Sequence, residues 1–354
     1  MTGRRASREE GGFVLALVVM MLFAISVAGA AGYLVVNTEF SMARYSQQGA
    51  EAESVARAGL HRFVAEQLGV VGDSVSYAIG NGVALITTRK VAELDSLNHV
   101  YYIRSEGTVT DVLNPSTPAR RVVGAYAYHR KRPLKHWGAL VVAASGGWAD
   151  AQSGSAPGEV DGDDHNTSSD CAGGGAASIP GIIARVSTGT VNGGTLDGSP
   201  PGKVWGGGYA AIYDSVALRW DILTDPGLPV DFDTTPGSPP NFGALPADSF
   251  PVVRVNGSYF NPGSSWSGRG VLIVPGELDA ASGFSWNGIV LAGDVDDIHE
   301  STIRGMLISG LGGSPAYSNV YWRGTIRYYS CYVYAANESL SYLELIDNTE
   351  FETF

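Results

Sequence analysis

The stretch REEGGFVLALVVMMLFAISVAGAAGYLVV, residues 8–36, decides the architecture of this chain, because it passes at Gly11-Gly12 from charged to wholly apolar sequence. Phe13–Val36 alone spans 24 residues without a charge. As an α-helix that segment measures about 36 Å, long enough to cross a hydrocarbon core of ~30 Å. The sequence therefore predicts a membrane-spanning helix behind a short charged leader, residues 1–12.

The flanks of this segment set its expected orientation. Three arginines precede it, and by the positive-inside rule they hold the N-terminus in the cytoplasm. A secretory signal peptide is an alternative, since Ala28-Gly29-Ala30 offers a small-residue cleavage site. Against it, two glutamates lie directly before the apolar run, and helical periodicity continues past that site. A plain membrane anchor explains the length of the run but not this continued periodicity.

The segment SQQGAEAESVARAGLHRFVAEQL, residues 46–68, has a single apolar helix face. Its apolar residues recur at i, i+3, i+4 and i+7 spacing. They are Ala52, Val55, Ala56, Gly59, Leu60, Phe63 and Val64. We expect one continuous helix within residues 13–69, about 80 Å long, apolar all round in 13–36 and amphipathic in 46–68. The amphipathic half needs a globular domain to pack against.

This two-part helix, behind a charged leader that ends in Gly12 and with Phe13 directly after it, resembles the type IV pilin-like family. The resemblance covers about residues 8–68 and is closest to PilX-type minor pilins, which carry an AES-x-A-R-A-G-L-like stretch, here Ala52 to Leu60. It implies that a prepilin peptidase cuts after Gly12 and that Phe13 becomes the methylated N-terminus. It also implies residence in a bacterial inner membrane as a single-pass protein, exposure to the periplasm or cell surface, and partners among other pilins or pseudopilins and the inner-membrane assembly platform.

One departure from the family narrows this expectation. Most major pilins carry a glutamate at the fifth position after the cut, where this chain has Leu17. Its absence resembles PilX-type proteins and the tip pseudopilin of type II secretion, so the resemblance implies a minor subunit of a type IV pilus or pseudopilus rather than the main fibre subunit. Gly29 and Gly32 thin the apolar helix, which permits close helix packing, although ordinary membrane-helix glycines are the simpler interpretation.

Composition divides the rest of the chain into two parts. Residues 1–136 hold 15 basic and 11 acidic residues, whereas residues 137–354 hold 8 and 24. So acidic a distal part repels phosphates and argues against a nucleic-acid partner. Short alternating or β-branched runs predict a small pilin-like β-sheet in residues 70–135, and the 47 glycines favour a turn-rich, mainly-β domain in residues 136–354. The predicted class is α+β.

A repeat near the C-terminal end of the chain suggests how this acidic domain is built. Four similar segments contain Gly268, Gly288, Gly305 and Gly324, at nearly regular intervals. One short strand plus turns per repeat predicts a parallel β-helix or similar solenoid, in which glycines let the chain turn corners. An antiparallel β-sandwich also gives short, regularly spaced strands and remains the alternative.

Two further features of the acidic domain suggest stabilising sites. Cys171 and Cys331 both follow the apolar segment, so in an exported domain they are candidates for one disulfide, with two structural thiols as the alternative. Four aspartates lie close together in the sequence, a composition that binds Ca²⁺, although their spacing does not match an EF-hand and a mobile acidic loop is the favoured interpretation. They are Asp161, Asp163, Asp164 and Asp170.

No pattern in the sequence identifies an enzyme. The segment GDVDDIHES, residues 293–301, places Asp294, Asp296 and Asp297 beside His299, and paired carboxylates serve glycosidases. A membrane-tethered β-helix enzyme that acts on polysaccharide is therefore one alternative. An acidic turn between coils is the simpler interpretation, and the chain lacks a nucleophile elbow, a phosphate-binding loop and a zinc-binding histidine pair. We expect a non-enzymatic protein without a cofactor, with a membrane-anchored adhesin that binds a glycan or cell-surface ligand through Trp148 or Trp205 as another alternative.

Overall fold

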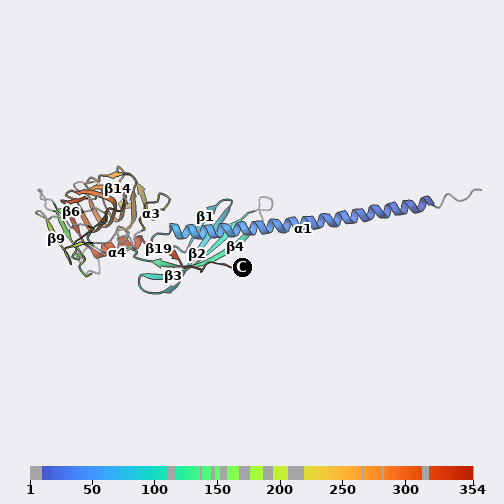
Figure 1. Cartoon of the computed structure of the whole chain (residues 1–354), viewed down its shortest axis with the longest axis horizontal. Coiled ribbons are helices and arrows are strands. Elements are labelled where there is room, and N and C mark those ends of the chain that lie inside the picture. The colour runs from blue at the N-terminus through green and yellow to red at the C-terminus, as the bar shows by residue number, and fades with distance from the viewer. Residues whose placement is uncertain are drawn as a thin grey trace, which may run out of the picture.

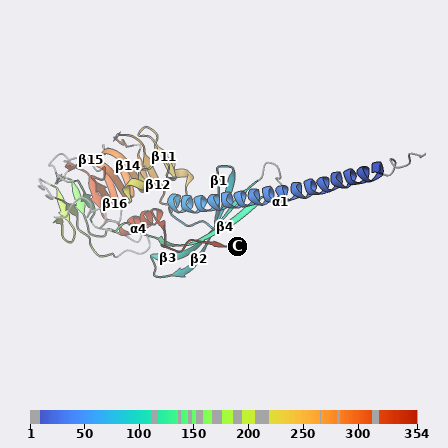
Figure 2. The same cartoon turned by 45° about the vertical axis from the view of Figure 1, so that its right-hand side comes forward.

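The computed structural model describes residues 10–110, 117–135, 138–144, 148–151, 158–166, 176–185, 194–205, 219–264, 266–280, 283–312 and 319–353. Within them a long helix projects from a head that consists of a small sheet and a larger β domain (Figure 1). The larger domain lies beyond the C-terminal end of the helix, and the small sheet lies along the helix's second half (Figure 2).

Helix α1 runs without a break from Glu10 to Glu66, which confirms the predicted long helix. Its second half packs on the sheet through the predicted apolar face, where Ala52, Ala56 and Leu60 are fully buried. Two glycines allow this close approach. A Cβ on Gly59 would lie 2.3 Å from the Cβ of Ala84, and a Cβ on Gly107 would lie 2.0 Å from the Ala52 carbonyl O.

The small sheet is antiparallel, in the order β1-β2-β3-β4-β19, with β20 also paired to β4. Its strands are β1 (Ser74–Ile79), β2 (Gly82–Glu93), β3 (Asn98–Val109), β4 (Ala119–Arg130), β19 (Tyr342–Leu345) and β20 (Phe351–Thr353). The sequence predicts a single domain in residues 136–354, but β19 and β20 return to the first sheet. They pair with the two ends of β4, which would otherwise be an open edge strand.

The larger domain is a parallel solenoid, so the sandwich alternative is wrong: every strand pair described there is parallel. Its described strands are β5 (Leu140–Val142), β6 (Trp148–Ala151), β7 (Glu159–Asp161), β8 (Ile182–Ala184), β9 (Thr195–Asp197), β10 (Gly202–Val204), β11 (Phe232–Thr234), β12 (Val252–Val255), β13 (Tyr259–Phe260), β14 (Ser267–Ala280), β15 (Ser285–Ile298), β16 (Thr302–Ser309), β17 (Asn319–Trp322) and β18 (Thr325–Arg327). The longest column of stacked strands has the order β10-β8-β5-β16-β15-β14-β12-β11.

This strand order shows that the chain enters the solenoid in its middle. From β5 it winds outward through β8 to β10, and it then resumes at the opposite end with β11. Short helical turns α3 (Trp220–Leu223) and η1 (Phe242–Ala244) lie in the connections on either side of β11. From β12 the chain winds back coil by coil to β16, which pairs with β5.

Two chain segments far apart in sequence therefore close one coil between them. The main-chain N–H of Leu307 donates to Ala139 O at 2.8 Å, and that of Tyr328 donates to Asp161 O at 2.9 Å. Beside these bonds, the guanidinium of Arg327 contacts both carboxylate oxygens of Glu159 at 2.9 and 2.8 Å. The solenoid is continuous in space although it is not continuous in sequence.

Glycines turn the corners of the coils, but not all of those that the repeat suggested. Gly270, Gly288 and Gly305 are register partners with φ values of +109°, +131° and +147°. Gly268 instead pairs with Trp286, and Gly324 adjoins Ser301, so neither belongs to this column. The corner column therefore starts at Gly270, and two of the four glycines of the predicted repeat, Gly268 and Gly324, lie outside it.

Helix α4 (Ser330–Ser339) covers the outside of the longest column of strands. Four consecutive residues of β14, Val271 to Val274, are buried, as expected for a strand covered on both faces. The helix also holds the connection from β4. Buried Asn337 accepts a hydrogen bond from Leu134 N at 3.0 Å and donates one to Leu134 O at 2.6 Å.

Candidate functional site

The first half of α1 is the most unusual surface of the protein, because its large apolar side chains contact no other part of the fold. Met20, Phe23 and Tyr33 are 76%, 71% and 72% exposed. Among the described residues this is the one helix long and apolar enough to cross a membrane, and its most apolar stretch is not buried at all. Such a surface is stable in lipid or against other helices, not in water.

Polar groups in this half-helix are satisfied within the helix itself. The hydroxyl of Ser26 donates to Leu22 O at 2.8 Å, and that of Thr38 donates to Val35 O at 2.7 Å. Gly29 and Gly32 have no neighbouring atom within 4 Å. They leave a bare strip of backbone on the helix, where another helix can approach closely.

The residues predicted to govern processing lie at the start of the same helix. Gly12 and Phe13 are in the first turn of α1, and Leu17 follows one turn later with 43% exposure. The predicted leader falls mostly outside the described residues. Position 17 therefore presents an apolar side chain, and not a carboxylate, on the exposed apolar half of the helix.

The aspartates of the predicted Ca²⁺ loop serve structural hydrogen bonds where they are described. Asp161 accepts from Asp163 N at 2.8 Å and contacts the His165 ring at 2.6 Å. The carboxylate of Asp164 accepts the hydroxyl of Ser330 at 2.7 Å and the Ser330 N–H at 3.0 Å. Burial raises the pKa of Asp164, but these hydrogen bonds outweigh it and leave the pKa below its ordinary value.

The last aspartate of the predicted Ca²⁺ loop and the two cysteines of the predicted disulfide are described only in part. Asp170 and Cys171 lie outside the described residues, and Cys331 is disulfide-bonded. In the described part of the chain, no group of three or more His, Cys, Asp or Glu side chains is placed to hold a metal ion. The Ca²⁺ site stays a prediction.

Carboxylates from successive coils stack along one edge of the solenoid, where the sequence showed its acidic turn. Glu277 is the register partner of Asp294. Burial, followed by repulsion from Asp296 and Asp294, raises the pKa of Glu277. Asp297 forms an ion pair with Arg323. Repulsion among these carboxylates therefore opposes folding along this edge.

The two tryptophans considered for glycan stacking both lie in the solenoid domain. Trp148 begins β6, and Trp205 is half-buried against the solenoid core. The ammonium of Lys203 lies 5.8 Å from the centre of the Trp205 ring. The Trp205 ring is therefore partly covered, and glycan binding stays a prediction.

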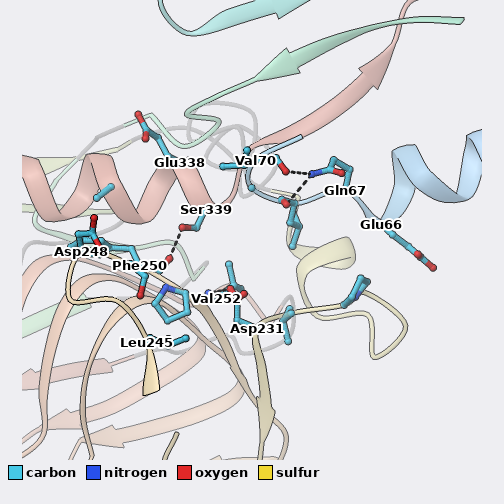
Figure 3. Close-up of a pocket in the computed structure, with 17 residues that line it drawn as sticks. Glu66, Gln67, Val70, Asp231, Leu245, Asp248, Phe250, Val252, Glu338 and Ser339 are labelled. Carbon is cyan, nitrogen blue, oxygen red and sulfur yellow. Dashed lines mark hydrogen bonds between the residues drawn. The ribbon is translucent and has the colours of Figure 1, made fainter. Parts of the chain in front are cut away.

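A pocket of about 630 Å³ lies where the end of α1 meets the solenoid (Figure 3). Four carboxylates line it, and none of its described lining residues is basic. These are Glu66, Asp231, Asp248 and Glu338. Three of them already have structural partners: Glu66 pairs with Arg62, Glu338 with Arg132, and Asp231 accepts from Val252 N at 2.8 Å.

Beside this pocket, residues 67–70 after the end of α1 lie next to Phe250, Ser339 and Ser341, and we call this region the joint. Side-chain and main-chain hydrogen bonds hold it together. Gln67 donates to Leu68 O and Val70 O, each at 3.0 Å, and Ser339 donates to Phe250 O (Figure 3). Gly69 and Ser341 bond each other through Gly69 N to Ser341 O at 2.9 Å and Ser341 Oγ to Gly69 O at 2.6 Å.

Sequence reasoning missed this joint because its members are far apart in the chain. Residues from the end of α1, from the connection after β4 and from α4 meet only in the folded protein. The one local signal was the basic run HRKRPLK at residues 129–135, whose arginines turn out to pair with Glu344 and Glu338. Comparison with family models, curated proteins and solved structures finds no match for this chain.

Proposed function

We propose that this chain is a non-enzymatic minor pilin or pseudopilin-like subunit that is inserted in a bacterial inner membrane, cleaved after Gly12 and packed into a filament. The exposed apolar half of α1 carries the proposal. A soluble enzyme has no use for a helix of 57 residues whose first half touches nothing, whereas a subunit held first by lipid and then by neighbouring helices requires one.

The energetics of the apolar half fit both stages. Phe13–Val36 contains 13 Leu, Ile, Phe and Val residues. At about 0.5 kcal/mol each they favour membrane insertion by up to ~6 kcal/mol, enough for a stable yet extractable anchor. The glycine strip at Gly29 and Gly32 supports lateral contact between helices after insertion.

Two observations support a minor or tip subunit. In the family that this chain resembles, most main fibre subunits carry a glutamate at the position of Leu17, which is thought to pair with the N-terminal amine of a neighbouring subunit. Leu17 has no such carboxylate. The solenoid also extends beyond the C-terminal end of α1 (Figures 1 and 2). In a bundle of parallel helices a domain placed there crowds any subunit stacked above it, which suits an end position or a low copy number.

Sequencing the mature N-terminus tests this proposal. A start at Phe13 supports the pilin class, a start at Ala31 indicates a secreted protein, and a start at Met1 or Thr2 indicates a simple anchor. Gly12→Glu is expected to block maturation and filament incorporation. Gly3→Glu, which places the same charge in the leader away from the junction, is the matched control and is expected to mature normally. Normal maturation of Gly12→Glu would refute the proposal.

A further inference from the structure

The inner face of the small sheet extends past the end of α1, and polar side chains occupy it there. Along β4, Ala125 and Ala127 are buried under the helix, and the next residue on that face is His129. Its register partner on β3 is His99. Because side chains alternate along a strand, the inward-facing positions of these strands normally hold apolar core residues. Two histidines at such positions indicate that this part of the face serves something other than the apolar core.

These histidines line a separate pocket of about 260 Å³ on the other side of the joint. Its lining contains two lysines and two histidines and one carboxylate, Glu338, which already pairs with Arg132. Outside the lining, the carboxylate of Glu93 pairs with Lys90 and lies 3.8 Å from Nε2 of His99. The described lining residues are Val70, Val71, Lys90, His99, Tyr101, His129, Lys131, Glu338 and Ser341. This pocket has the opposite electrostatic character to the acidic pocket of Figure 3, with which it shares Val70 and Glu338.

The two lysines differ in how far they are neutralised. Lys90 forms an ion pair with Glu93, a side chain that is itself 57% exposed. Lys131 forms no ion pair with any described residue, and its main-chain N–H donates to Leu97 O at 2.9 Å. Lys131 therefore brings an uncompensated positive charge to the pocket.

The imidazoles are closely packed and incompletely satisfied. His99 and His129 are 7% and 4% exposed, and their ring centres lie 6.1 Å apart. Nε2 of His129 lies 3.4 Å from Gly69 O, and since a carbonyl can only accept, this nitrogen carries the proton in the neutral ring. Nδ1 of His129 is buried and has no hydrogen-bond partner among the described residues. A proton added to the ring therefore lacks an acceptor.

We propose that this pocket binds a small oxyanion, a carboxylate or phosphate group, through the ammonium groups of Lys131 and Lys90 and the imidazole of His99. The ligand's negative charge offsets that of Lys131 and stabilises the protonated forms of both histidines. The site is independent of filament assembly, since it is built by β2, β3, β4 and the joint and not by the exposed half of α1.

Binding is expected to depend on pH, because the empty pocket disfavours charged imidazoles. Burial, then the charge of Lys90, lowers the pKa of His99; burial, with smaller contributions from His99 and Lys131, lowers that of His129 despite its hydrogen bond to Gly69. The other groups that face the pair are Tyr101, Glu93, Asp95 and Glu338. An anion favours the protonated rings, so its binding takes up protons and tightens as pH falls.

Calorimetric titration of the full-length protein in a non-ionic detergent tests the proposal, with inorganic phosphate and glucuronate as probes. We expect saturable binding at one site, at least about tenfold tighter at pH 5.5 than at pH 7.5. Tighter phosphate binding identifies a phosphate site, and tighter glucuronate binding a carboxylate site. His99→Gln and His129→Gln together are expected to remove the pH dependence.

The lysine variants make the test decisive. Lys131→Met is expected to weaken binding at least about tenfold, whereas Lys135→Met, an exposed lysine in the same basic run but outside the pocket, leaves it unchanged. Circular dichroism confirms that each variant folds. Absence of saturable binding by either probe, or equal binding by Lys131→Met and wild type, would overturn the proposal even if the histidine variants fail to fold.

Discussion

The corner glycine Gly305 offers a direct test of the coil geometry. Its φ of +147° lies in a region that L side chains rarely adopt. A Cβ added there would lie 1.9 Å from the carbonyl O of Gly288, the register partner in the neighbouring coil. Alanine adds one carbon atom and nothing else, so the effect of Gly305→Ala isolates this corner.

The expected loss of stability has two sources. Forcing a side chain into this region of φ and ψ costs about 1–3 kcal/mol. The contact with Gly288 is also well below 3.0 Å, the limit that real Cβ atoms respect. Relieving it requires β15 and β16 to separate within a hydrogen-bonded ladder. We expect the free energy of unfolding of the solenoid to fall by about 4 kcal/mol, or on the order of 10 °C in Tm for a domain of this size.

Tryptophan fluorescence measures this loss selectively. All seven tryptophans follow residue 136, so their emission reports the solenoid and not the sheet that packs on α1. Gly263→Ala is the matched control, because a Cβ at Gly263 meets nothing within 4 Å and its φ is not in the strained range. Both variants are heated as full-length protein in non-ionic detergent. Equal melting midpoints for the two variants would refute the reasoning.

Three further predictions concern buried polar and charged groups. Asn337→Leu removes both hydrogen bonds to Leu134 and is expected to cost about 2 kcal/mol; faster proteolysis in residues 131–135 would show it, and an unchanged cleavage rate would contradict it. Arg254, 1% exposed, donates to three main-chain carbonyls and to a carboxylate. Arg254→Met is expected to cost about 3 kcal/mol, measured as a lower urea midpoint; a midpoint equal to wild type would argue against its structural role. Because the pKa of Glu277 is raised, its ionised form destabilises the folded state, and Glu277→Gln is expected to gain a few tenths of a kcal/mol at pH 7. That gain should vanish as the pH falls below the ordinary glutamate pKa, where the carboxyl is protonated in both states, and a gain that persists there would show that charge is not its cause.

The repeat of glycines illustrates how far local pattern carries a prediction. Glycines at nearly regular intervals, with a strand in each unit, predicted the solenoid, and the structure confirms it. The same pattern could not choose between Gly268 and Gly270, which are close together in one segment, because both fit the repeat. The choice depends on which residue meets the carbonyl of the neighbouring coil, and only Gly270 shares the positive φ of its register partner Gly288.

The end of the chain shows a second limit. The sequence placed residues 342–345 in the solenoid-like domain, but they form β19 of the first sheet. In the structure β19 covers the free edge of β4, a strand from a much earlier part of the sequence. The paired histidines of β3 and β4 were likewise visible as isolated residues and acquired meaning only as register partners beyond the end of α1.

The sequence by itself determined the long helix, its division into an apolar and an amphipathic half, and the β-rich solenoid. These features depend on hydrophobic periodicity, which is local. Only the tertiary structure decided where the chain enters the solenoid, which glycines turn its corners, and which residues meet at the joint and in its two pockets. Those depend on contacts between segments distant in sequence, where the free energy comes from the whole packed arrangement and no single segment contains the information.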